Sequence, residues 1–308
     1  MAGPDASGGG RRPSAVSSLQ PPASGLRRTW YLRLRRYVQV ASLLVVNSSF
    51  LVGLGARGVC VPVLNCWACP AASFACPLGA LQNAVADARA VFVLPLYILG
   101  SLLAVSGIFG RMMCGWLCPF GLLQDLLAKL SRRKYTIPGW MSYTRYAVLV
   151  GLVLIVPYFT GIPWFCKLCP QGALEGGIFQ PLLHAELRPL IGAWWYAKMG
   201  ILAAVLAGAV FSRRAFCRVI CPLGAIFSLF NRVSLFQMRY DSKKCTDCGW
   251  CVRHCPQGID PRRDLGGHTC IGCLECAKCP FDAISVTTAL SPDRGAEGAD
   301  HAGEGTDT

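Results

Sequence analysis

The feature that most constrains this chain is a run of eight cysteines near its C-terminus. The first four are spaced C-x2-C-x2-C-x3-C-P, and the second four are spaced C-x2-C-x2-C-x2-C-P. Paired runs of this kind bind two [4Fe–4S] clusters, and the fourth cysteine of each run binds the other cluster. The spacing therefore predicts two ligand sets, namely Cys245, Cys248, Cys251 and Cys279 for one cluster and Cys255, Cys270, Cys273 and Cys276 for the other.

Two other interpretations of this run are weaker. Structural zinc is usually bound by two C-x2-C pairs, whereas here a compact run of four cysteines occurs twice. Dense disulfide frameworks belong mainly to small secreted domains. The second run has one residue fewer than usual between Cys276 and Cys279, so the ligand role of Cys279 is the one that departs from the common pattern.

The rest of the chain is too apolar for an ordinary soluble protein. Hydrophobic residues make up 53% of the 308 residues, charged residues only 15%, and the mean hydropathy is +0.43. A bilayer core of about 30 Å requires about 20 mostly apolar residues in a helix. Four stretches predict membrane-spanning helices, roughly 37–54, 91–109, 146–160 and 194–211. The third is short and contains Pro157, so we expect it to be extended or kinked.

The alternative, that these stretches are core helices of a soluble protein, is disfavoured because they contain almost no charge. We therefore expect an α-helical membrane protein with a C-terminal α+β ferredoxin domain of the bacterial 2[4Fe–4S] type. The expected boundaries are a disordered tail at 1–26, a four-span membrane domain at 27–235, the ferredoxin domain at 236–289 and a disordered tail at 290–308. Residues 284–288 are expected to form the last strand of the ferredoxin domain.

Basic residues are distributed unequally around the predicted spans, and the net charge is +14. The side that carries residues 27–36, 129–134 and 213–232 is much richer in Lys and Arg than the other. Because short cytoplasmic loops are the basic ones, we expect a multi-pass protein of the bacterial cytoplasmic membrane. Both termini and the ferredoxin domain then face the cytoplasm. The basic residues lie beside apolar spans, which disfavours a nucleic acid as partner.

A second cysteine pattern is repeated four times along the predicted membrane domain. The sequence C-P-x-G begins at Cys76, Cys118, Cys169 and Cys221, once at one end of each span, and the order of spans and turns indicates an internal duplication. Proline favours the first turn of a helix, so each cysteine is expected at a helix N-terminus, where the helix dipole stabilises negative charge.

The predicted topology sorts the cysteines of this domain into two sets. The inner set faces the cytoplasm and consists of Cys114, Cys118, Cys217 and Cys221. The outer set consists of Cys66, Cys69, Cys76, Cys166 and Cys169. Each set has enough thiolates for one further [4Fe–4S] cluster. The alternative is that these cysteines are reduced thiols packed at helix ends, and Cys60 or Cys76 is a candidate bystander of the outer set.

Other cofactors find little support in the sequence. The four histidines, at positions 184, 254, 268 and 301, lie outside the predicted spans, which disfavours membrane haem, and no P-loop motif is present. Polar residues near the turns are candidates to take protons from a quinol, although ordinary interfacial residues look the same. These candidates are Gln82, Glu175, His184 and Glu186 near the outer turns, and Gln124 and Asp125 after an inner turn.

The combination of motifs resembles the NapH/NosR family of membrane polyferredoxins. The residues that carry the resemblance are C-G-W-L-C-P-F-G from Cys114 to Gly121, the second C-x3-C-P at Cys217, four spans and the C-terminal double ferredoxin. It implies a quinol dehydrogenase-type role, in which electrons pass from the quinone pool towards a periplasmic reductase or its accessory system. The 308 residues include no large N-terminal flavin-binding region, so the NapH type is the expected one.

The leading hypothesis is thus a membrane-bound iron–sulfur electron-transfer protein that connects the quinone pool with other redox subunits. Whether it acts as a quinol dehydrogenase itself is left open. The alternative is a redox-sensing factor, or an assembly factor that reduces a metal centre of another metalloenzyme. A metal transporter ranks last, because the spans contain few polar residues.

Overall fold

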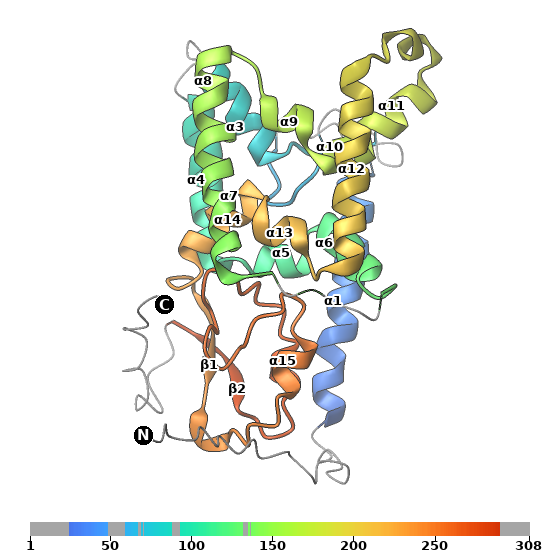
Figure 1. Ribbon diagram of the computed structural model, residues 1–308. Coiled ribbons are helices and arrows are strands. Elements are labelled where there is room, and N and C mark those ends of the chain that lie inside the picture. Colours follow the sequence, from blue (N-terminus) through green and yellow to red (C-terminus); the bar gives the residue numbers. More distant parts are fainter. Residues whose placement is uncertain are drawn as a thin grey trace, which may run out of the picture.

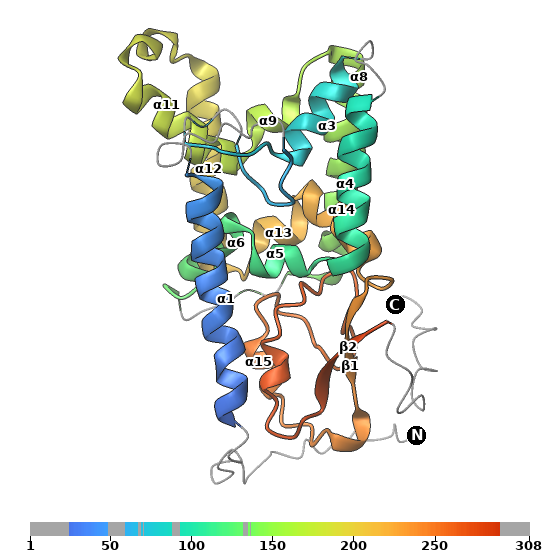
Figure 2. The ribbon, with the colours of Figure 1, turned by 180° about the vertical axis from the view of Figure 1, so that it is seen from behind.

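The computed structural model describes residues 25–48, 59–66, 69, 71–87, 93–131, 135 and 137–289. The predicted tail 290–308, and all but the last two residues of the predicted tail 1–26, lie outside this range. The described chain is mostly helical. Long helices stand side by side in the upper part of Figure 1, and a small module with two strands lies below them (Figures 1 and 2).

The long helices correspond to the four apolar stretches. They are α1 (Gly25–Val46), α4 (Val93–Phe109), a continuous helix from Gly139 to Thr160, and α12 (Ala193–Phe211). Within the described residues, two of them, Gly139–Thr160 and Ala193–Phe211, are long and apolar enough to cross a membrane, and the apolar part of α4, Leu96–Phe109, is shorter. The first predicted span leaves the described residues after position 48. The prediction of four spans is therefore supported for two of them.

The helix Gly139–Thr160 changes its winding along its length. It begins as η1 (Gly139–Tyr143) and α7 (Thr144–Ala147), widens into the π-helix η2 (Val148–Ile155), and ends as α8 (Val156–Thr160). Pro157 has no backbone N–H to donate and cannot complete the α-helical ladder, so the wider turn before it relieves the mismatch. The predicted irregularity at Pro157 is found, and the helix is also longer than the sequence indicated.

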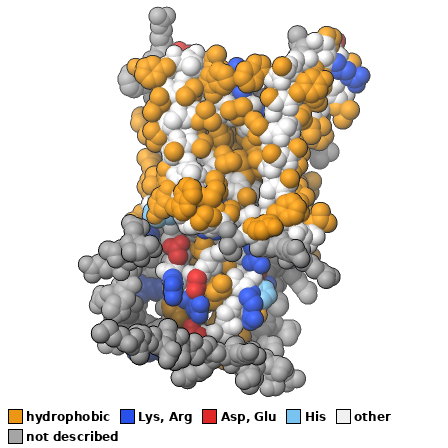
Figure 3. All heavy atoms as spheres, in the orientation of Figure 1, with side chains coloured by type: hydrophobic (Ala, Val, Ile, Leu, Met, Phe, Trp, Pro, Cys, Tyr) orange, Lys and Arg blue, Asp and Glu red, His pale blue; other side chains and the backbone are white. Residues whose placement is uncertain are grey.

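The outer faces of the long helices are apolar and exposed. Leu96 and Phe159, 71% and 79% exposed, are among the many large hydrophobic side chains on this surface. Figure 3 shows hydrophobic side chains covering the upper part of the molecule, whereas Lys, Arg, Asp and Glu gather on the lower part. An apolar exterior of this extent is typical of a surface that contacts lipid or protein.

Each C-P-x-G turn starts a short helix between the long ones. These helices are α3 (Pro77–Ala86), α6 (Pro119–Leu127), α10 (Pro170–Gly172) and α14 (Pro222–Phe230). In all four, the cysteine is the N-cap with an extended backbone, φ between −75 and −63° and ψ between 111 and 125°, and proline follows at the first helical position. The predicted helix starts are confirmed, and their shared conformation supports the duplication.

The remaining helices of the upper part connect these elements. The short helices α5 (Met112–Trp116) and α13 (Ala215–Val219) precede α6 and α14, and α9 (Trp164–Leu168) precedes α10. After α10 the chain continues through the π-turn η3 (Ala173–Gly177), α11 (Ile178–Leu183) and the 3-10 helix η4 (Ala185–Leu190). The buried core between the elements contains the cysteines Cys76, Cys118, Cys169, Cys217 and Cys221.

Residues 236–289, the C-terminal module, form a two-stranded sheet with loops around it. Strand β1 (Phe236–Tyr240) pairs antiparallel with β2 (Ile284–Thr288), in the register Phe236 opposite Thr288 and Tyr240 opposite Ile284. The helix α15 (Trp250–His254) and the 3-10 turns η5 (Ser242–Lys244) and η6 (Cys276–Lys278) lie in the connection. The predicted last strand is confirmed.

The C-terminal module packs closely against the helical part. A side chain at Gly115 would lie 2.6 Å from the carbonyl oxygen of Ile271, so only glycine permits this approach. The indole of Trp116 donates a hydrogen bond to the Gly272 carbonyl at 3.1 Å. Helix α1 also runs down beside the module (Figure 2), and Arg35 forms an ion pair with Glu275 at 3.1 Å.

Candidate metal centres

The inner set of cysteines is brought together between the two halves of the helical part. Cys114 lies on α5 and Cys118 caps α6, while Cys217 lies on α13 and Cys221 caps α14. Cys221 interacts electrostatically with the other three thiols. The structure therefore groups the four residues that the duplication predicted, two from each half.

Donors surround the sulfur atoms of this inner set. The side-chain amide of Gln124 donates a hydrogen bond to Cys217 Sγ at 3.1 Å, and the backbone N–H of Gly224 donates to Cys221 Sγ at 3.5 Å. Hydrogen bonds to sulfur stabilise thiolate ligands and influence the reduction potential of an iron–sulfur cluster. The donor set thus fits an anionic cluster.

Two arginines connect the halves beside this set. Arg111 donates to the carbonyl of Cys217 at 2.8 Å, and Arg214 donates to the carbonyl of Cys114 at 3.0 Å. Arg214 also forms an ion pair of 2.6 Å with Asp125, which in turn accepts from Arg35 at 2.8 Å. Burial opposes ionisation of Asp125, but the two guanidinium groups outweigh it and lower its pKa. Asp125, one of the weak candidates for proton uptake in the sequence, thus lies in an ion-pair network with two arginines.

Cysteines of the outer set also lie close together. Cys166 interacts electrostatically with Cys76, Cys169 and Cys66, and Cys169 interacts with Cys76 and Cys66. These four cysteines are one more group of the size that a cube requires. Cys69 is buried and lines a neighbouring pocket. Cys60 lies six residues before Cys66 in the sequence. It interacts electrostatically with Cys76 and is partly exposed.

Polar groups close to the outer set are also buried. Glu175 accepts a hydrogen bond from the backbone N–H of Cys66 at 2.7 Å, and burial raises the pKa of this carboxyl to about 7. The side chain of Gln82, six residues after Cys76, is fully buried and neither of its polar atoms has a partner within the described chain. His184 and Glu186, the other two quinol candidates, are exposed on the segment after α11.

In the C-terminal module, the second predicted ligand set is assembled. Cys255, Cys270, Cys273 and Cys276 are all buried and line one small cavity. Burial raises the pKa of the Cys273 thiol to about 12. A cationic iron–sulfur core would hold such a thiol as a thiolate, because metal binding displaces its proton.

The first ligand set lies nearer the surface. Cys245, Cys248 and Cys251 are partly exposed, whereas Cys279 is buried. Their assignment to one cluster therefore stays a prediction. Within the described residues, no three His, Cys, Asp or Glu side chains are arranged to hold a single metal ion. The ligands of a cube bind four different iron atoms, so they do not need to meet at one point.

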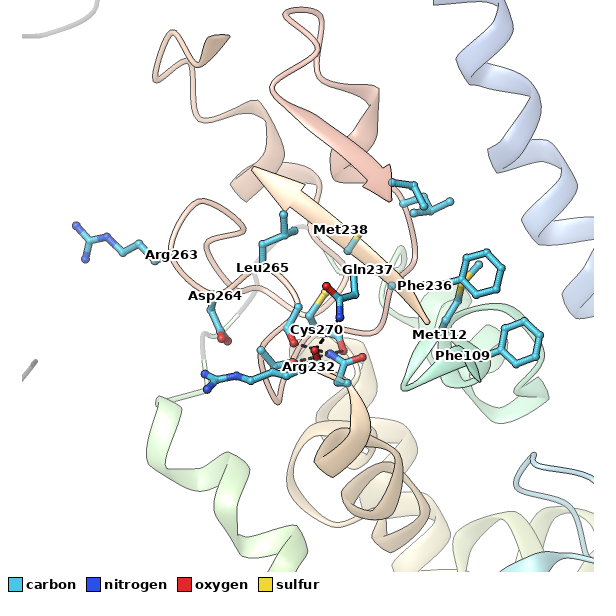
Figure 4. Close-up of a pocket in the computed structure, with 16 residues that line it drawn as sticks. Phe109, Met112, Arg232, Phe236, Gln237, Met238, Arg263, Asp264, Leu265 and Cys270 are labelled. Carbon is cyan, nitrogen blue, oxygen red and sulfur yellow. Dashed lines mark hydrogen bonds between the residues drawn. The ribbon is translucent and has the colours of Figure 1, made fainter. Parts of the chain in front are cut away.

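A pocket opens where the C-terminal module meets the helical part. Cys270 lines it together with Phe109, Arg232 and Phe236, and Figure 4 shows Cys270 beside Arg232. The amide of Asn231, at the end of α14, donates to the carbonyls of Gly267 at 2.7 Å and Cys270 at 3.2 Å. These contacts fix the loop that carries a predicted cluster ligand.

Comparison with known families agrees with the two kinds of cysteine motif. A family described as a 4Fe-4S binding domain matches residues 73–95, 91–138, 144–188 and 194–240, and a second family of the same description matches residues 238–259. Each of the four segments contains one C-P-x-G turn, and together they cover more than half of the chain. The chain belongs to the 4Fe–4S binding domain family. Its repeated turns are thus recognised iron–sulfur motifs.

Known relatives confirm the expected resemblance to the NapH/NosR family and include proteins named NosR, whereas the narrower expectation of a NapH type stays a prediction. The polyferredoxin is 34% identical over 194 residues to the uncharacterized protein MJ0750 of Methanocaldococcus jannaschii, covering 59% of this chain and 74% of that protein. It is 29% identical over 204 residues to the regulatory protein NosR of Stutzerimonas stutzeri, covering 62% of this chain and 26% of NosR. It is 28% identical over 151 residues to the methylamine utilization ferredoxin-type protein MauN of Methylobacillus flagellatus, covering 48% and 49%. No solved structure matches the chain.

The buried arginines at the inner set were not singled out from the sequence. A signal was present, because both C-x3-C-P motifs are preceded three residues earlier by arginine, Arg111 before Cys114 and Arg214 before Cys217.

Proposed function

We propose that the polyferredoxin is a membrane protein that passes electrons between the quinone pool and a redox partner through [4Fe–4S] clusters. The proposal is supported by groups of buried and half-buried cysteines at successive levels of the molecule, from the outer set through the inner set to the C-terminal module. In this proposal each cluster accepts and releases one electron at a time. The chain's own residues hold the clusters, exclude water and bind the quinol.

A pocket of about 480 Å³ carries the quinone part of the proposal. Its walls are apolar and come from α1, α6 and α11, and Cys69, Gln171 and Glu175 lie at its outer-set side. Gln171 is buried, and its carbonyl oxygen has no hydrogen-bond partner in the described chain. An apolar slot with an unpaired acceptor suits an amphiphile with an isoprenoid tail and a hydroxyl on its head group. Gln171 would accept a hydrogen bond from that hydroxyl.

Filling the pocket should separate quinol oxidation from cluster binding. Leu183 lines the pocket and its neighbour Leu182 does not, and both are exposed on α11. We expect Leu183→Trp to slow cluster reduction by a short-chain quinol at least tenfold, while reduction by dithionite is unchanged. The measurement is anaerobic bleaching of the cluster absorbance in detergent, and Leu182→Trp is the matched control. Equal quinol rates in both variants and the wild type would refute the pocket as the quinol site.

The orientation is part of the proposal. The helical part crosses the bacterial cytoplasmic membrane, and the C-terminal module faces the cytoplasm, since the basic residues gather on its side. A reporter that is active only in the cytoplasm, fused after residue 289, should be active. Activity of a periplasm-specific reporter at the same position would contradict this orientation.

Regulation is the second candidate, because the relative NosR bears the name regulatory protein. In that case the clusters would respond to the redox state, or serve assembly of another metal centre, without turnover of quinol. Clusters that dithionite reduces and that no quinol analogue reduces, in otherwise intact wild-type protein, would favour this candidate over the first.

A further inference from the structure

Arg111 and Arg214 occupy equivalent positions in the two halves of the helical part. Each lies three residues before the first cysteine of a C-x3-C-P motif, is fully buried and donates to the carbonyl of the equivalent cysteine in the other half. Each also lies against a glycine of the opposite C-P-x-G turn. A side chain at Gly121 would contact the Arg214 guanidinium at 3.3 Å, and one at Gly224 would contact that of Arg111 at 3.2 Å. The two arginines therefore have equivalent contacts in the two halves, as the internal duplication would produce.

The two arginines differ in their counter-charge. Arg214 pairs with Asp125, which lies seven residues after Cys118. The equivalent residue in the second half, seven after Cys221, is Ser228, and its hydroxyl is hydrogen-bonded to the Ala225 carbonyl and the Tyr146 hydroxyl. The second half thus lacks the acid that neutralises the arginine in the first.

Within the described chain, the guanidinium of Arg111 binds only neutral backbone oxygens. It donates to the carbonyls of His268 at 2.6 Å and Cys217 at 2.8 Å, and its Nε has no partner. A second buried arginine, Arg145, donates to the same His268 carbonyl and adds a like charge. A buried charge without a compensating opposite charge is strongly unfavourable. A negative charge close to Arg111 is therefore required.

Cysteine thiolates are the anions that surround this position. Arg111 interacts electrostatically with Cys114, Cys217 and Cys221 of the inner set, and also with Cys270 of the C-terminal module. Four thiolates exceed the positive charge of a [4Fe–4S] core, so the cluster is anionic and becomes more negative on reduction. A cation between two such groups stabilises their reduced states more than their oxidised states.

We propose that Arg111 is the counter-charge of the inner cluster and of the neighbouring cluster at Cys255, Cys270, Cys273 and Cys276, and that it raises the reduction potentials of both. Its position at the junction makes it a positioning and tuning residue for electron transfer between the helical part and the C-terminal module. The inference rests on cluster binding at these two sites, which is part of the proposed function, and is independent of the quinone.

The test is a redox titration of the anaerobically purified full-length protein, followed by electron paramagnetic resonance. In Arg111→Gln, the equilibrium between oxidised and reduced forms of both clusters should shift at least tenfold towards the oxidised form. This corresponds to a potential lower by about 59 mV for a one-electron couple. Arg111→Lys keeps the charge and should keep most of the potential. Exposed Arg188, changed to Gln, is the control that should show no shift.

A second variant tests the same charge without removing the arginine. Ser228→Asp supplies the acid that the first half already has, and should lower the potential in the same direction as Arg111→Gln. Ser228→Asn is its uncharged control and should not. Iron content is measured in every variant, so that loss of a cluster, which would bear on the proposed function, is distinguished from a shift in its potential. If Arg111→Gln does not fold, the potentials measured for Ser228→Asp decide whether the charge at Arg111 raises them. Unshifted potentials in iron-replete Ser228→Asp, or equal shifts in Arg111→Lys and Arg111→Gln, would overturn the proposal.

Discussion

Replacing Asp125 with Asn should lower the free energy of unfolding by about 3–5 kcal/mol, because removal of one partner leaves buried charges uncompensated. Asp125 is the carboxylate that faces both Arg214 and Arg35. The side chain of Arg214 is fully buried and that of Arg35 is 6% exposed. Neither guanidinium can regain water without opening the core. Denaturant-induced unfolding of anaerobically purified protein, monitored by tryptophan fluorescence, measures the loss.

The control is Glu275→Gln, which removes the contacts of this carboxylate with Arg35 and Lys278 but leaves the pairs of Asp125 with Arg35 and Arg214 in place. That change should cost only about 0–1 kcal/mol, because neither buried guanidinium is left without a carboxylate. The pH dependence supplies a second check. Because the folded state lowers the pKa of Asp125, its contribution is present above the pKa of the unfolded chain and is lost as the pH falls. Stabilities of the wild type and Asp125→Asn should therefore converge in acid, and a gap that persists there would contradict the ion-pair account.

Replacing Cys217 with Ser should remove one cluster, and with it about four irons per chain. Cys217 is buried within the inner set. Its sulfur accepts a hydrogen bond from the Gln124 side chain, and its backbone carbonyl accepts one from Arg111. Serine is a poor ligand for iron, so one of the four irons of the cube would have no thiolate ligand. Iron analysis and the electron paramagnetic resonance spectrum of the dithionite-reduced protein measure the loss.

Cys60→Ser is the matched control for this prediction. Cys60 interacts electrostatically with Cys76 of the outer set, and the groupings described above leave it outside every set of four. Its replacement should leave the iron content unchanged. An equal loss of iron in Cys60→Ser, or no loss in Cys217→Ser, would show that the groups of cysteines have been assigned wrongly.

The local patterns were the part of the site that the sequence predicted well. The spacing of the C-terminal cysteines placed Cys255, Cys270, Cys273 and Cys276 in one set, and the structure lines one cavity with them. The repeated C-P-x-G motif predicted four helix starts, and all four cysteines adopt the same N-cap conformation. Both predictions depend on backbone geometry over a few residues, which local sequence largely determines.

Contacts between distant segments could not be predicted in the same way. Arg35 belongs to a basic run that the sequence interpreted only as a topology signal, yet it lies against Glu275, which is 240 residues away. The N-terminal part of α1, which precedes the apolar stretch, lies beside the C-terminal module (Figure 2), and Arg35 is buried there. The buried charge network around Asp125 arises only when α1, α6 and α13 come together. The pattern of residues within any one of these segments does not predict that contact.

Iron and acid-labile sulfide per chain, measured on protein purified without oxygen, test the central claim most directly. Four groups of cysteines, each holding one cube, predict about sixteen irons and about sixteen sulfides. Values of about eight of each, unchanged by Cys217→Ser, would mean that only the C-terminal module binds clusters and would contradict the account of the helical part.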